Sequence, residues 1–156
     1  MAGGVLGYKE PRVSKVAFDP AGIVLDDDVS ERLAELLLAL ASDYEAVSDQ
    51  KRARSLAVFI RLFPAALSGR EANRQLIRGL QPESQMLGMG LKEAVSELWK
   101  VASEIDAQAV TEDETQLARY LAAVVLAYAD AKDPRFARAR KLLGRDGPGP
   151  LWKGVL

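Results

Sequence analysis

Arginines at regular spacing are the residues of this sequence best suited to bind a ligand. Arg70, Arg74 and Arg78 are four residues apart, so they lie on one face if the segment is helical. The arginine guanidinium binds phosphates and carboxylates through two parallel N–H donors. Like charges at this spacing repel each other by about a few tenths of a kcal/mol. The stripe therefore predicts a compensating anion, either an acidic helix of the same chain or an external polyanion.

Further cations extend this prediction to other parts of the chain. Lys51, Arg54 and Arg61 also share one face of a predicted helix. The full anion- or nucleic-acid-binding set is Lys51, Arg54, Arg61, Arg70, Arg74, Arg78, Arg135 and Arg138. The net charge of −1 and the pI of about 5.6 argue against an independent nucleic-acid-binding protein. They are compatible with a subunit that contributes one basic face to a larger complex.

The absence of cysteine and histidine removes most catalytic and metal chemistry. The chain has neither residue, which excludes zinc–thiolate sites, thiolate nucleophiles and a triad with a histidine base. The three consecutive acids Asp26, Asp27 and Asp28 suit a helix N-terminus better than a metal site. We expect no metal, no other cofactor and no catalysis. An enzyme that uses carboxylates or lysines remains an open alternative.

The C-terminal sequence GPGPLWKGVL places apolar side chains where a polar tail is usual. Pro148 and Pro150 stiffen and extend this segment, so we expect an arm that projects from the domain. An aromatic residue on such an arm can dock in a groove, either on its own bundle or on a neighbouring subunit. The predicted partner-docking residues are Leu151, Trp152, Val155 and Leu156.

The elements that position these residues are helices with 3–4 apolar spacing. Capping signals predict helix starts at Asp28 (with Glu31), Ser68 (with Glu71), Thr111 (with Glu114) and Asp133-Pro134, and Ser48 begins a further helical segment. Pro64, Gly79 and Gly144 are predicted to end helices, and LGMGL (87–91) is predicted to interrupt one. Residues 12–25 carry strand-like runs around a DPAG turn, which predicts a short hairpin. Trp99 is predicted to lie in the core.

The fold class expected from these patterns is all-α. We expect a single-domain bundle of five to six helices over 26–144, preceded by an extended segment over 1–25. A C-terminal docking arm over 145–156 completes the chain. No apolar run approaches the ~18 residues of a membrane span, and the N-terminus lacks the order of a signal peptide. We therefore expect a cytoplasmic protein without a membrane partner.

The charge signs alternate along the chain, and this pattern leaves two interpretations open. Residues 26–50 and 80–114 are acidic, whereas 51–79 and 134–156 are basic. Successive helices of opposite sign can attract each other within one bundle. Alternatively, a basic block faces a phosphate backbone or an acidic partner.

The function expected from the sequence is that of a non-catalytic helical assembly subunit. Its partners would be other protein subunits, including copies of itself, with RNA or DNA bound through backbone contacts. A protein-only adaptor, an immunity protein or a chaperone is one alternative. Another is a helix-turn-helix regulator, since GLQPES (79–84) resembles a turn between two helices. Its recognition helix would contain Gly88 and Gly90 and no basic residue before Lys92, which disfavours base readout.

Overall fold

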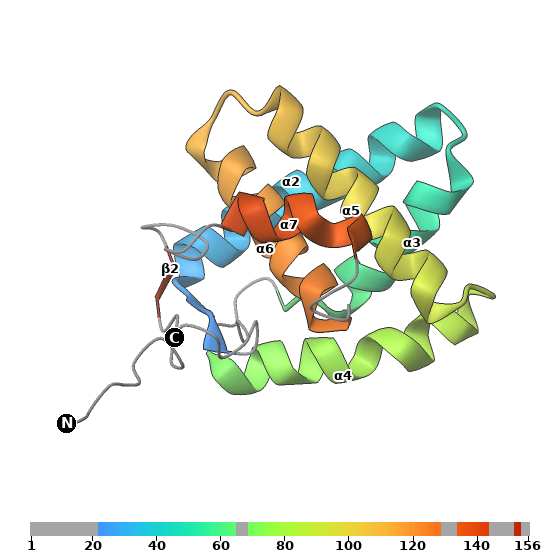
Figure 1. The fold of residues 1–156 in the computed structure, drawn as a ribbon, viewed down its shortest axis with the longest axis horizontal. Coiled ribbons are helices and arrows are strands. Elements are labelled where there is room, and N and C mark those ends of the chain that lie inside the picture. Colours follow the sequence, from blue (N-terminus) through green and yellow to red (C-terminus); the bar gives the residue numbers. More distant parts are fainter. Residues whose placement is uncertain (1–21, 65–68, 129–133, 144–151, 154–156) are drawn as a thin grey trace.

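The structure, a computed structural model, describes residues 22–64, 69–128, 134–143 and 152–153 (Figure 1). Within these ranges it forms six α-helices, a short 3-10 helix and two strands. The helices are α2 (Asp27–Ala46), α3 (Gln50–Leu62), α4 (Arg70–Met86), α5 (Leu91–Gln108), α6 (Glu112–Tyr128) and α7 (Ala137–Leu143), and Pro134–Phe136 form the 3-10 turn η2. The strands are β1 (Val24–Leu25) and β2 (Trp152–Lys153). The predicted all-α bundle of five to six helices is confirmed.

Helix α6 is central, because its sequence is apolar on almost every side. From Gln116 to Val125 every residue except Arg119 is buried. It packs against α2, α5 and α7, and α7 crosses in front of α5 and α6 in Figure 1. The small residues Ala118 and Ala122 are fully buried, so neighbouring helices approach α6 closely. This packing makes one continuous hydrophobic core with α3 and α4.

Several helix boundaries follow the local chemistry that the sequence predicts. The capping box is confirmed at α6, where the Glu114 amide donates to the Thr111 hydroxyl (3.1 Å) and Glu114 Oε1 accepts from the amides of Thr111 (3.0 Å) and Val110 (2.9 Å). Pro64 ends α3 as predicted, since Phe63 is already extended with ψ 111°. The predicted cap at Asp28 is wrong. The N-cap of α2 is Asp26, because all three acids favour a helix N-terminus and the first of them is extended.

Helix α4 continues through the segment 79–84, which the sequence predicts to be a turn between two helices. Gly79 was predicted to follow a helix end, but it lies inside α4, and so does Pro82. A Cβ at position 79 would lie 2.8 Å from Leu62 Cδ2, so this glycine allows α3 to pack closely on α4. The turn predicted at 79–84 is therefore wrong, and with it the two-helix arrangement that suggested a helix-turn-helix.

The predicted interruption at LGMGL is confirmed. Gly88 adopts φ +72°, a left-handed conformation that glycine reaches without steric cost. The chain turns there between α4 and α5. Three other predicted boundaries, Ser68, Asp133 and Gly144, lie outside the described residues. The N-cap of α3 is Asp49 and not Ser48, and its side chain accepts a hydrogen bond from the Arg52 amide (3.3 Å).

The two short strands join the beginning and end of the described chain. Strands β1 and β2 pair antiparallel, with Val24 opposite Lys153 and Leu25 opposite Trp152. The extended conformation predicted for this part of 1–25 is confirmed at Val24–Leu25. The other half of the predicted hairpin, and the arm residues 145–151 and 154–156, lie outside the described residues. No helix in the described ranges has both the length and the apolar character needed to cross a bilayer.

Candidate functional site: the basic face of α4

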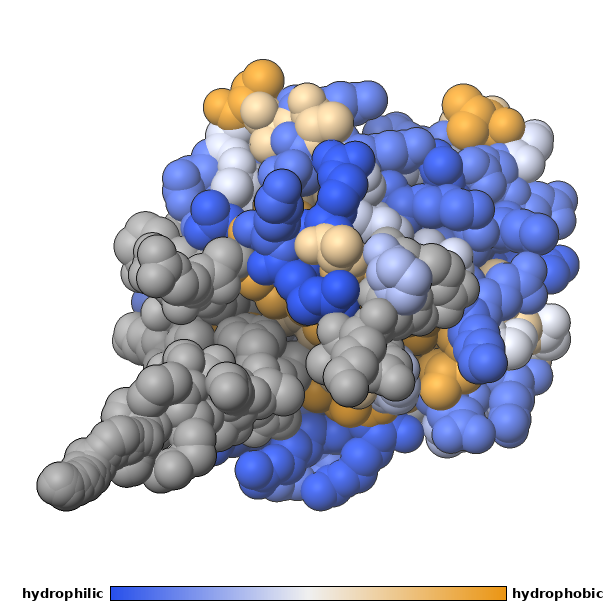
Figure 2. All heavy atoms as spheres, in the orientation of Figure 1, coloured by the Kyte–Doolittle hydropathy of each residue, from blue (hydrophilic) through white to orange (hydrophobic). Residues whose placement is uncertain are grey.

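Helix α4 carries three predicted binding residues on one exposed face. Arg70, Arg74 and Arg78 are all exposed, whereas Leu76 and Leu80 on the opposite side are buried in the core. Figure 2 shows hydrophilic residues along the lower edge of the molecule, where α4 lies. We call this surface the α4 basic face, and define it as Arg70, Arg74, Arg78, Gln81 and Gln85, which are exposed and three or four residues apart.

The cations of the α4 basic face are only slightly neutralised. Arg78 Nη1 lies 3.7 Å from Glu71 Oε2, and both side chains are about two-thirds exposed (65% and 67%). An ion pair as exposed as this one contributes little. Arg70 and Arg74 make no ion pair with any residue of the described part. The face therefore has the positive charge and the arginine geometry to bind phosphates or carboxylates.

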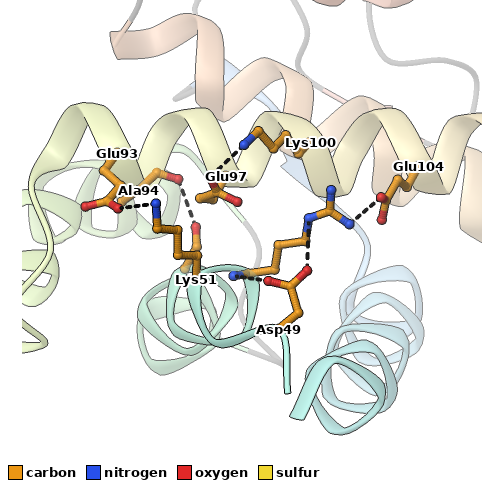
Figure 3. A network of polar contacts seen from close by, with 9 residues as sticks. Asp49, Lys51, Glu93, Ala94, Glu97, Lys100 and Glu104 are labelled. Atoms are coloured by element: carbon orange, nitrogen blue, oxygen red, sulfur yellow. Dashed lines mark hydrogen bonds and ion pairs between the residues drawn. The ribbon is translucent and has the colours of Figure 1, made fainter. Parts of the chain in front are cut away.

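The cations of α3 are in a different situation, because three of the four, Lys51, Arg52 and Arg61, pair within the bundle. Lys51 Nζ lies 3.5 Å from Glu93 of α5, and Arg61 Nε lies 3.1 Å from Glu83 of α4. Figure 3 shows Lys51 reaching across to Glu93. Arg54 is exposed and makes no ion pair with described residues. For Lys51, the attraction to the acidic helix α5 accounts for the charge. Arg61 instead pairs with one acid of α4, a helix with more arginines than acids.

A polar network between α2, α3 and α5 was not predicted from the sequence, and Figure 3 shows its contacts between α3 and α5. Arg52 binds Glu104 and lies 3.5 Å from Asp49, and the Tyr44 hydroxyl donates to Glu104 at 2.7 Å. Burial, and then the hydrogen bond to Glu104, raise the pKa of Tyr44 to about 12. Ser55 donates to the carbonyl of Ala94 at 2.8 Å. These contacts fix the α3–α5 interface.

Arg138 lies apart from α4, in a hollow between α5 and α7. This hollow has a volume of about 220 Å³ and is lined by Trp99, Ser103, Asp106, Arg138, Lys141 and Leu142. Trp99, predicted to be a core residue, is only partly buried and lies at the edge of the core. Arg135 belongs to η2, but its side chain is not described.

Arg54 lies at a second hollow, of about 370 Å³, near the α2–α3 turn, with Tyr44, Ser48 and Asp49 among its other lining residues. The acids and cations lining the two hollows are exposed or only partly buried. In the described ranges no three Asp or Glu side chains come together in a way that could hold a metal ion.

Of the predicted docking arm, only Trp152 and Lys153 are described. Their backbone pairs with β1 of the same chain. Leu151, Val155 and Leu156 lie outside the described residues, so their predicted docking role stays a prediction.

The chain matches no protein-family model, no curated protein and no solved structure. The function is therefore argued from the geometry and charge of the α4 basic face.

Proposed function

We propose that this chain is a non-catalytic helical subunit that docks in an assembly through the α4 basic face. The partner surface is polyanionic, either a nucleic-acid backbone or an acidic protein surface. The observation that carries the proposal is that Arg70 and Arg74 are exposed on one helix face and make no ion pair with described residues. The bundle pairs Lys51 and Arg61 internally, but leaves these two guanidiniums open.

The spacing of the arginines supports the same conclusion. Each residue of an α-helix rises about 1.5 Å, so residues four apart are separated by about 6 Å along the helix axis. Guanidiniums at this separation contact successive anionic groups of an extended partner. Gln81 and Gln85, on the same face, add side-chain donors without adding negative charge.

A salt-dependent titration tests this proposal. Arg70→Ala/Arg74→Ala removes the two arginines that have no ion pair in the described part, and it leaves the Arg78–Glu71 pair intact. We expect weaker binding to single-stranded RNA at low salt. The slope of log K against log salt should also fall, by about 0.7 for each phosphate that the variant no longer neutralises. Polyglutamate as a second probe separates an acidic-protein partner from a nucleic acid.

Lys92→Ala/Lys141→Ala is the matched control. It removes the same charge from two exposed positions on α5 and α7, and it should leave the titration unchanged. If the wild-type chain binds neither RNA, DNA nor polyglutamate at low salt, the α4 basic face is not a polyanion-binding site. Equal losses in the control and the arginine variant would mean that only net charge matters.

A further inference from the structure

Helix α2 carries an acidic face that is the counterpart of the α4 basic face. Its exposed residues recur at intervals of three and four along the helix. We call this surface the α2 acidic face, and define it as Asp28, Glu31, Glu35, Leu38, Ser42 and Glu45. None of its four carboxylates makes an ion pair with another described residue. Leu38, in the middle of the face, is 58% exposed and gives the face one apolar contact point among its acids.

The two faces belong to different sides of the bundle. Helix α2 buries Leu33 and Leu37 and packs against α3 and α6. Helix α4 packs against α3 and α5. Within the described residues, no ion pair joins the α2 acidic face to the α4 basic face. Each molecule presents both an acidic helix face and a basic helix face.

The arginine stripe is similar in length to the first part of the α2 acidic face, Asp28 to Glu35, and Glu45 lies about 15 Å further along α2. From Arg70 to Arg78 the axial distance is about 12 Å, and from Asp28 to Glu35 it is about 10.5 Å, at about 1.5 Å per residue. Three cations on one helix thus match three carboxylates on the other. Such a match favours the correct encounter and orients the two helices.

We infer that the α4 basic face of one copy docks on the α2 acidic face of a second copy. The inference rests on the proposed function, in which α4 is the docking face, and it names the partner. A second copy fits better than a nucleic acid, because the chain has a net charge of −1 and the carboxylates of α2 repel phosphates.

The contact joins unlike faces, so it is heterologous. Each added copy leaves one acidic and one basic face open, and assembly continues to a ring or an open chain. A single pair of helices lies at the lower end of interface sizes. The association is therefore weak and depends strongly on salt, since exposed charges are screened within about 10 Å at 0.1 M salt.

Charge reversal with complementation tests the inference. Sedimentation over a range of concentrations at low salt compares the wild-type chain with Arg70→Glu/Arg74→Glu and with Glu31→Lys/Glu35→Lys. We expect the wild type to form oligomers that dissociate as salt is added. Each reversal should weaken this association by about tenfold or more, because like charges then face each other. An equimolar mixture of the two variants should associate again, since each supplies the charge that the other has lost.

Lys92→Glu/Lys141→Glu is the control, because it changes net charge as much as the arginine reversal does but lies outside both faces. It should associate like the wild type, and circular dichroism should show that all variants are folded. A wild-type chain that stays monomeric at low salt overturns the inference, and so does a mixture that fails to associate.

These results are separable from the test of the proposed function. If the wild type is monomeric but Arg70→Ala/Arg74→Ala weakens RNA or polyglutamate binding, the proposed function stands and the partner is not a second copy. If oligomers form and both reversals disrupt them, while RNA and polyglutamate are not bound, the α4 basic face is specific for the α2 acidic face. If the wild type neither associates nor binds a polyanion, both proposals are wrong.

Discussion

Asn73 is the residue that ties the N-terminal strand to the helical core. Its side chain is buried at 7% exposure. The amide nitrogen donates to the carbonyl of Ile23, and the amide oxygen accepts from the hydroxyl of Tyr120. One side chain on α4 therefore satisfies a backbone group next to β1 and a fully buried hydroxyl on α6. Burial also raises the pKa of Tyr120 above its ordinary value, so this hydroxyl stays protonated and able to donate.

Replacing Asn73 should destabilise the fold more than its small size suggests. Asn73→Ala removes the hydrogen bonds that its side chain makes with the Ile23 carbonyl and the Tyr120 hydroxyl. Loss of the partner of a buried polar group costs about 1–3 kcal/mol, so we expect a loss in this range in urea unfolding. Gln75→Ala on the exposed side of α4 is the control, and its effect should stay within about 0.5 kcal/mol. Equal effects of the two changes would contradict this role of Asn73.

Glu114 gives the stability of α6 a dependence on pH. Backbone hydrogen bonds from Val110 and Thr111 lower the pKa of Glu114 below its ordinary value of 4.5. A lowered pKa in the folded state means that the contribution is present above about pH 4.5 and is lost as the pH falls through the folded value. Glu114→Gln should therefore flatten the decline of the melting temperature in this acidic range. Glu35→Gln, an exposed acid that caps no helix, should keep the wild-type slope; if it flattens equally, the cap is not responsible.

Helix α4 is the element on which both proposals depend, and its continuity is unusual for its sequence. Pro82 lies within it and is exposed. A proline inside a helix removes one backbone hydrogen bond and crowds the preceding turn. The flanking contacts keep the helix intact, with Leu80 and Ser84 buried on its inner side. Gln81 and Gln85 thereby stay on the same face as the arginines.

Pro82→Ala should stabilise the protein if α4 is continuous. The substitution restores a helical N–H and removes the ring, so we expect a gain of about 1–3 kcal/mol in chemical unfolding, up to the difference between proline and alanine inside a helix. Pro64→Ala is a useful comparison, because Pro64 follows the end of α3 and should show no such gain. A neutral or destabilising effect of Pro82→Ala would indicate that the segment 79–84 turns in solution.

Local chemistry made some elements predictable and left others out of reach. The start of α6 follows from Thr111 and Glu114 alone, because a capping box is closed by residues three apart. The length of α4 does not follow from its own sequence. Whether the helix ends at Gly79 or continues through it depends on the contact of Gly79 with Leu62 of α3. No sequence spacing reveals that contact.

The candidate site, too, is predictable from the sequence only in part. The period of the helix predicts that Arg70, Arg74 and Arg78 share a face. Which cations are neutralised depends on contacts between helices, such as Lys51 with Glu93, and these require the fold. Arg52, Glu104 and Tyr44 were missed for the same reason, since they come from three different helices.

At the scale of the whole molecule, two routes to assembly make different predictions for this chain. One is the electrostatic contact between the α4 basic face and the α2 acidic face. The other is an exchange of the C-terminal strand, because β2 pairs with β1 over only two residues. In the structure this pairing is made within one chain. Strand β2 lies beside β1, which leads directly into α2. The two routes respond to different changes.

Deleting residues 147–156 distinguishes them. The deletion removes β2 and exposes the edge of β1, where Leu25 is only 2% exposed. We therefore expect a lower melting temperature. Because β2 pairs with its own chain, this decrease should not depend on protein concentration. A β-strand exchanged between copies would instead give a decrease that grows with concentration, together with loss of oligomers in light scattering.

The truncated chain keeps both charged faces, so its salt-sensitive association should match that of the full chain. If the deletion abolishes that association, the C-terminal arm rather than α4 carries the contact between copies.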